Sequence, residues 1–132
     1  MDRLFVDTSA WFAYANRKDP DHHAVGDVLK GFKGRLATTN FVFDETVSLC
    51  RCRLGYRAAN SVGSALLDSE TIDLIRVTPE DEQTAWTLFC ERPDQRYSFT
   101  DCTSFALMRR LRLSTALALD DDFRVEGFRV VP

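Results

Sequence analysis

Two short apolar runs, each followed at once by a carboxylate, constrain the fold of this chain more than any other feature. Residues 4–6 (Leu-Phe-Val) precede Asp7, and residues 115–119 (Thr-Ala-Leu-Ala-Leu) precede Asp120. A nearly continuous apolar run is typical of a strand that is buried on both faces of a parallel sheet. Ligands of open α/β sheets bind at the carboxyl ends of the strands. We therefore expect both acids at that edge, and close together if the two strands are neighbours.

Helical and strand patterns alternate along the rest of the chain. Three further strands are predicted, at residues 36–39, 72–77 and 128–131. Thr8 or Ser9 is predicted to cap the first helix and Asp21 the second, while Thr78 and Pro79 begin a later helix. This alternation predicts an α/β fold, a three-layer α/β/α sandwich around a mainly parallel sheet of about five strands. A length of 132 residues fits one domain, which we expect to span residues 1–132.

Composition excludes several classes of protein. No apolar stretch approaches the roughly 20 residues of a membrane-spanning helix, and the acidic start Met1-Asp2-Arg3 is unlike a signal peptide. The four cysteines form no C-x-x-C pair and have no histidines at the spacing of a zinc site. They are typical of reduced thiols, so we predict a cytoplasmic protein.

Two more acids are predicted on the inward faces of helices. Glu45 shares one helical face with four apolar residues, which are Phe41, Val42, Leu49 and Cys52. Asp101 opens a later helix and shares a face with Phe105 and Met108. A buried carboxylate is costly without a partner. The alternatives are a salt bridge to an arginine for Glu45 and an ordinary capping role for Asp101.

The arginines offer a possible phosphate-binding surface. The net charge is −3, but the remainder becomes mildly basic once the converging acids are set aside. The arginines gather in two groups, Arg51, Arg53 and Arg57, and Arg109, Arg110 and Arg112. Such groups can hold phosphates, and salt bridges within the protein are the alternative.

Converging carboxylates imply a particular chemistry. They repel one another unless a cation neutralises them. Oxygen ligands without histidine or thiolate suit Mg²⁺ or Mn²⁺ and not zinc. Such an ion makes water a better nucleophile and stabilises charge on phosphoryl oxygens, so the reaction we expect is hydrolysis of a phosphodiester.

The four acidic stretches occur in an order that is similar to a known family. They are Asp7-Thr8-Ser9, Glu45 on its helix, Ser98-Phe99-Thr100-Asp101, and Ala118-Leu119-Asp120-Asp121-Asp122-Phe123. Together they resemble the four acidic motifs of the PIN domain, and most closely those of VapC-type toxins of toxin–antitoxin pairs, nearly end to end. The resemblance implies a Mg²⁺-dependent endoribonuclease, with Mn²⁺ able to substitute.

The resemblance also implies a role for each matching residue. The catalytic acids are Asp7, Glu45, Asp101 and Asp120, and the metal ligands among them are Asp7, Asp101 and Asp120. The residues that position water or phosphate are Thr8, Ser9, Ser104 and Asp122. Three acids follow one another at residues 120–122, and we call them the triple acid. This run leaves open whether Asp120 or Asp122 faces the metal. We favour Asp120 and expect Asp121 to point away.

The implied partners are an RNA substrate, a second copy of the chain and a VapB-like antitoxin whose tail blocks the cleft. We expect a homodimer, formed through apolar helix faces at residues 56–67 or 86–89, and a heterotetramer or larger assembly with the antitoxin. DNA contact is expected only through the antitoxin, and no membrane contact is expected.

Three other classes of protein are alternatives to a toxin ribonuclease. A receiver domain would need an Asp at the end of its third strand and a lysine near the fifth, but the third strand ends Arg76-Val77 and no lysine follows Lys33. A PIN nuclease of RNA maturation and a catalytically silent PIN binding module both remain open as alternatives.

Overall fold

The computed structural model describes residues 2–132. Met1, which belongs to the N-terminal stretch predicted not to be a signal peptide, lies outside this range. The elements in chain order are β1 Arg3–Val6, α1 Thr8–Ala15, α2 His22–Gly31, β2 Arg35–Thr39, α3 Asn40–Arg53, α4 Tyr56–Asp68, β3 Ile72–Ile75, α5 Pro79–Glu91, α6 Phe99–Leu111, β4 Thr115–Leu117, α7 Asp122–Val125 and β5 Arg129–Val131. None of the helices in this described range is long and apolar enough to cross a bilayer.

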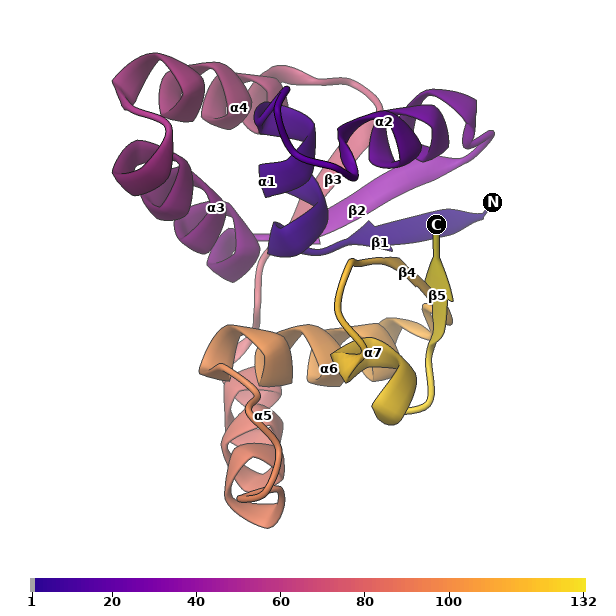
Figure 1. Ribbon diagram of the computed structural model, residues 1–132. Helices are drawn as coiled ribbons and strands as arrows, with labels where there is room; N and C mark the ends of the chain where they lie inside the picture. Colours follow the sequence, from indigo (N-terminus) through magenta and orange to yellow (C-terminus); the bar gives the residue numbers. More distant parts are fainter. Residues whose placement is uncertain (1) are drawn as a thin grey trace.

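The five strands form one parallel sheet in the order β3-β2-β1-β4-β5. Helices α1 to α4 cover one face of the sheet and α5 to α7 cover the other (Figure 1). The predicted three-layer α/β/α sandwich is therefore confirmed. Strand β1 lies in the centre, where Phe5 pairs with Ala37 of β2 on one side and with Ala116 of β4 on the other.

The strand order places a topological switch point between β1 and β4. From β1 the chain builds outward through β2 to β3, then crosses to β4 and builds outward through β5. The backbone N–H of Asp7 donates to the carbonyl of Leu117 at 3.0 Å, so the ends of β1 and β4 lie side by side. As predicted, the two strands that lead into acids are neighbours, and a ligand cleft forms at such a point.

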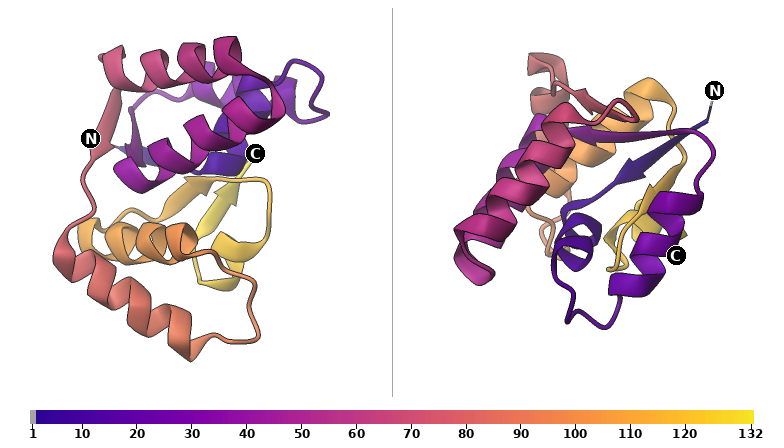
Figure 2. Two further views of the ribbon diagram at one scale, coloured as in Figure 1. Left: turned by 90° about the vertical axis from the view of Figure 1, so that its left-hand side faces the viewer. Right: turned by 90° about the horizontal axis from the view of Figure 1, so that it is seen from above.

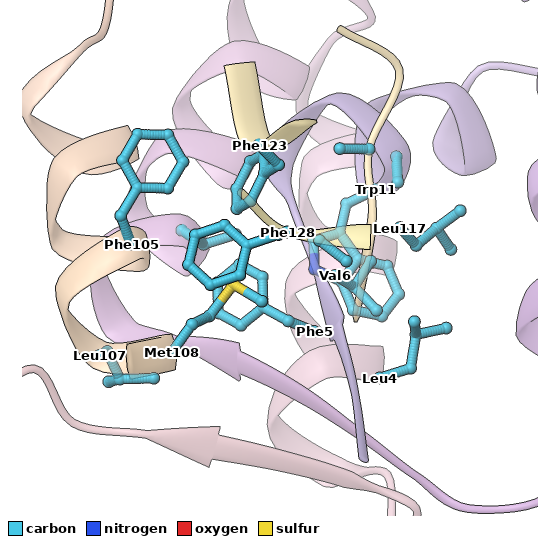
Figure 3. Packing of buried hydrophobic residues seen from close by; sticks show 14 of the residues in the cluster. Leu4, Phe5, Val6, Trp11, Phe105, Leu107, Met108, Leu117, Phe123 and Phe128 are labelled. Atoms are coloured by element: carbon cyan, nitrogen blue, oxygen red, sulfur yellow. The ribbon is translucent and has the colours of Figure 1, made fainter. Parts of the chain in front are cut away.

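A cluster of phenylalanines fixes α6 and α7 on the sheet. The rings of Phe5, Phe105 and Phe123 are fully buried, and those of Phe105 and Phe123 meet edge to face at 4.9 Å between centroids. Phe128 stacks on Phe105 at 6.0 Å, and Met108 lies among these rings (Figure 3). Because the cluster reaches from β1 to the helices that carry or follow the acids, the core sets the position of the cleft.

Helices α5 and α6 pack side by side, as the left view of Figure 2 shows. Arg110 of α6 donates two hydrogen bonds of 2.8 Å to the carboxylate of Asp81 on α5. These bonds hold the pKa of Asp81 below its ordinary value. Asp81 also completes a capping box with Thr78, so the predicted start of this helix is confirmed.

Two capping predictions were wrong. Thr8 and Ser9 lie inside α1, and the N-cap is Asp7, whose side chain accepts from the Ser9 N–H. Asp21 occupies the N-cap position of α2 but makes no capping bond with its side chain; its own N–H donates to Asp19. At α1 the carboxylate of Asp7 takes the capping role, whereas α2 has no side-chain cap at its first turn.

Candidate active site

Asp7 is a buried carboxylate at the junction of β1 and α1. Its side chain is only 3% exposed. One oxygen, Oδ2, accepts from the Ser9 hydroxyl at 2.8 Å and from the Ser9 N–H at 3.3 Å. The other oxygen, Oδ1, is buried and has no hydrogen-bond partner. Asp7 thus serves as a helix cap with one oxygen and leaves the second for a ligand.

Asp101 has a similar arrangement at the start of α6. Its Oδ2 accepts from the Ser98 N–H at 2.9 Å, while the Ser98 hydroxyl accepts from the Asp101 N–H at 3.0 Å. The capping box engages one carboxylate oxygen and holds the side chain at the first turn. Capping and a functional role, set against each other as alternatives, are therefore compatible at this residue.

The triple acid forms the turn between β4 and α7. Asp120 is exposed, and its Oδ1 accepts from the Asp122 N–H at 3.1 Å. Asp121 is turned outward as expected, since its side chain is 82% exposed and pairs with Arg124 at 2.6 Å. Asp122 is half-buried. These contacts leave both Asp120 and Asp122 on the side of the cleft.

Glu45 lies at the margin of the buried face of α3 and not at its centre. The buried line of α3 consists of Val42, Thr46 and Cys50, while Cys52 is exposed, so the predicted stripe was wrong by part of a turn. The buried line has the same spacing of four residues as Phe41, Glu45 and Leu49 but is displaced from them by one position. Glu45 is half-buried, and the ion pairs of residues 2–132 include none from its side chain. The alternative of a salt bridge to an arginine is therefore wrong.

The electrostatics show that the acids share one environment. Burial, followed by the charges of Asp101 and Asp120, raises the pKa of Asp7 from 3.8 to about 7. Burial also raises the pKa of Asp101 to about 6, and the charges of Glu45, Asp120 and Asp122 add to this. Raised pKa values caused by desolvation and like charges are typical of functional sites. The structure thus brings together the four acids that the sequence predicts.

The donor set fits a hard divalent cation. Among residues 2–132, no three Asp, Glu, His or Cys side chains are gathered tightly enough to hold a metal. The buried polar side-chain atoms without a partner in this range are Asp7 Oδ1, Thr8 Oγ1, Thr46 Oγ1 and Ser104 Oγ. Asp7 is itself one of the acids, and the other three residues lie beside or one turn from an acid. Unsatisfied oxygens concentrated in this way suit Mg²⁺ or Mn²⁺ and its water shell.

The supporting residues divide into two kinds. Thr8 and Ser104 are buried, and their hydroxyls have no hydrogen-bond partner. Ser9 is different, because its hydroxyl already donates to Asp7 and accepts from the Leu119 N–H at 3.1 Å. No sequence pattern predicts this contact, which joins residues 110 apart.

The second arginine group is largely engaged within the protein. Arg109 donates to Glu126 at 2.9 Å, and Arg110 binds Asp81. Glu126 also accepts from Arg92 at 3.2 Å and from the Tyr97 hydroxyl at 2.8 Å. Burial alone would raise the pKa of Glu126, but these hydrogen bonds outweigh it and lower the pKa. For Arg109 and Arg110 the salt-bridge alternative is therefore confirmed.

The comparisons with known proteins agree with the fold. Residues 4–127 match the PIN domain family. The chain is 36% identical over 125 residues to the 23S rRNA-specific endonuclease VapC20 of Mycobacterium tuberculosis, with 95% of each chain covered. It is 28% identical to Ribonuclease VapC26 of the same organism, covering 89% of this chain and 86% of that protein.

Solved structures give the same result. The crystal structure of VapC20, described as a toxin that cleaves the sarcin–ricin loop, matches with a TM-score of 0.92 at 35% identity, covering 98% of this chain and 99% of that one. A toxin–antitoxin complex from Klebsiella pneumoniae shares the fold, with a TM-score of 0.67 at 13% identity and coverage of 98% and 96%. The chain therefore belongs to the PIN domain family and, within it, to the VapC-type toxin ribonucleases.

Proposed function

We propose that this protein is a Mg²⁺-dependent endoribonuclease, active also with Mn²⁺, and the toxin of a VapBC-type pair in the cytoplasm. The observation that carries the proposal is the buried Asp7, whose Oδ1 is unpartnered and whose pKa is raised by burial and then by two neighbouring acids. PIN-domain VapC nucleases are generally metal-dependent. A carboxylate held in this way would otherwise be destabilising at neutral pH.

Each acid has a role that its position supports. Asp7 and Asp101, each with one oxygen engaged in a helix cap, would hold the cation together with Asp120 from the turn after β4. The bound cation would supply charge stabilisation to the phosphoryl oxygens and make water a better nucleophile. Glu45 orients that water from the margin of α3. Thr8, Ser104 and Asp122 line the same edge and position water or phosphate.

The best first substrate is the sarcin–ricin loop of 23S rRNA. VapC20 is described as cleaving this loop, and the present chain aligns with 95% of VapC20 at 36% identity. An isolated RNA hairpin of that sequence is therefore the probe of choice, with total cellular RNA as a wider pool. Arg51, Arg53, Arg57 and Arg112 are exposed arginines that can contact phosphates of a large RNA.

Asp101→Asn is expected to abolish cleavage of the hairpin and of the RNA pool while leaving the fold intact. The amide still accepts the Ser98 N–H, so the cap survives, but the charge that holds the cation is lost. Cleavage is followed on gels with Mg²⁺, Mn²⁺ or EDTA, and circular dichroism checks the fold. Asp121→Asn is the control, because its side chain is turned outward and should leave the rate unchanged. Equal cleavage by wild type and Asp101→Asn would contradict the site assignment.

The structure offers a groove for the antitoxin. A hollow of about 540 Å³ is lined mainly by residues of α1, α2 and α4. Figure 1 shows these three helices on the same face of the sheet. Its floor includes the buried Trp11 and Leu66, and its rim carries Arg17, His22 and Lys30. An apolar floor with a cationic rim fits an amphipathic segment that carries acidic residues.

Ala65→Glu is expected to prevent inhibition by the cognate antitoxin without changing RNA cleavage. Ala65 is exposed and lines the groove, so a longer acidic side chain there obstructs the segment and repels its carboxylates. The measurement is growth rescue when toxin variant and antitoxin are co-expressed, with the purified variant assayed for cleavage. Ala24→Glu is the matched control, because Ala24 is an exposed alanine of α2 that does not line the groove. Full rescue of the Ala65 variant would exclude this groove.

A homodimer remains a proposal, and two surfaces support it. On α4, Tyr56 is 66% and Leu67 62% exposed. On α5, Trp86 is 58% exposed and stacks on Phe89 at 5.6 Å between ring centroids. Both faces lie where the sequence predicts apolar contact surfaces. Large exposed apolar side chains that are grouped in this way are typical of protein contact sites.

A further inference from the structure

The Ser9 hydroxyl joins two parts of the candidate site that are far apart in the chain. A serine hydroxyl has one donor and two acceptor positions. Ser9 donates to Asp7 Oδ2 at 2.8 Å and accepts from the backbone N–H of Leu119 at 3.1 Å. The first partner is a catalytic candidate on β1–α1, and the second directly precedes Asp120. The hydroxyl is thus committed to the protein, unlike those of Thr8 and Ser104.

This contact selects which oxygen of Asp7 is free. Both donors of Ser9, the N–H at 3.3 Å and the hydroxyl at 2.8 Å, are directed to Oδ2. Two bonds to one oxygen fix the carboxylate plane, since rotation about χ2 would break both. Oδ1 is consequently left buried and without a partner.

The same contact extends the link between β1 and β4 beyond the sheet. The paired residues of these strands end at Val6 and Leu117, where the Asp7 N–H donates to the Leu117 carbonyl at 3.0 Å. Two residues later, at Leu119, the chain turns towards Asp120. The Leu119 N–H donates to the Ser9 hydroxyl and not to a backbone carbonyl. The turn that carries Asp120 is therefore tied to the helix that Asp7 caps.

We propose that Ser9 is a positioning residue, whose hydroxyl orients Asp7 and holds the Asp120 turn at a fixed place relative to it. This inference deepens the proposed function and rests on it for its effect on catalysis. The contact itself requires only the folded chain. Ser9 thus acts through Asp7 and Asp120 and does not contact phosphate, which replaces the role first expected for it.

Ser9→Ala tests the proposal, with Ser9→Thr as rescue and the exposed Ser48→Ala as control. In Ser9→Ala we expect kcat for RNA cleavage to fall about 10- to 100-fold with KM within about twofold, because misplaced groups slow the chemical step without weakening substrate binding. Hydrogen exchange of the Leu119 amide in the metal-free protein should become faster. Ser9→Thr keeps the hydroxyl and should restore both.

The outcomes separate this proposal from the function on which it rests. An unchanged kcat or an unchanged Leu119 exchange rate in Ser9→Ala would overturn the positioning role, as would a Ser9→Thr variant that is equally slow. Absence of cleavage by wild type would count against the function alone, since Leu119 exchange still decides the contact. Should Ser9→Ala unfold, Ser9→Cys keeps the side-chain volume with a much weaker donor and acceptor and gives the same comparison.

Discussion

Asp7→Asn is expected to abolish RNA cleavage and, without divalent ions, to stabilise the protein at a pH of about 8. The loss of activity follows from removing the carboxylate that holds the cation. The gain in stability follows from burial, because the wild-type side chain is only 3% exposed and its pKa is raised to about 7. An amide is neutral at every pH and can still cap α1, since asparagine is as good an N-cap as aspartate.

The sign and the pH range follow from proton linkage. The ordinary pKa of the carboxyl is 3.8 and the folded value is about 7, so the folded state binds more protons between these limits. The free energy of unfolding of the wild type therefore falls as pH rises through this range. The full difference, of the order of 4 kcal/mol for about three pKa units, is present above pH 7 and vanishes below the ordinary pKa.

Urea denaturation of wild type and Asp7→Asn, at pH values of about 4 and about 8 with EDTA, measures this difference. Asp94→Asn is the control, because Asp94 lies in an exposed loop and should change neither stability nor cleavage. Adding Mg²⁺ should then stabilise the wild type and not the Asp7 variant. Equal stability of the two proteins at pH 8 would show that the Asp7 carboxylate is not under electrostatic stress in the folded state.

The sequence predicts the fold, and the convergence of the four acids at one edge of it, because both follow from local patterns. Apolar runs that end at Asp7 and Asp120 indicate buried parallel strands, and strand ends in such a sheet share one edge. The helix that Asp101 opens is marked by its apolar spacing. None of these inferences needs knowledge of a particular long-range contact.

The parts that the sequence does not predict depend on distant partners. One such contact joins Ser9 to Leu119. Another is Glu126, which accepts hydrogen bonds from Arg92 and Arg109. In both cases only the finished fold brings the segments together. The error on α3 has a similar cause, since Cys52 belongs to an apolar spacing but the neighbouring elements cover Cys50 instead. Choosing between two apolar stripes one residue apart requires the packing partner.

Phe123→Ala is expected to destabilise the protein by about 3–5 kcal/mol and to reduce cleavage as well. Phe123 follows the triple acid directly, is fully buried, and contacts Phe105 at 4.9 Å, Phe5 at 5.9 Å and Phe128 at 6.2 Å between ring centroids (Figure 3). Truncation removes these aromatic contacts and leaves a cavity in a core that cannot close around it. Thermal and urea denaturation measure the loss.

The functional consequence follows from what Phe123 anchors. It lies in α7, which begins at Asp122, so it secures the far end of the turn whose near end is Leu119. A turn held only at one end samples more positions of Asp120, and the rate should fall even at temperatures where the variant stays folded. Val125→Ala, on the same short helix but 56% exposed, should leave both stability and rate unchanged. A folded Phe123→Ala protein with the wild-type rate would mean that the acidic cleft is fixed by β1 and α6 alone.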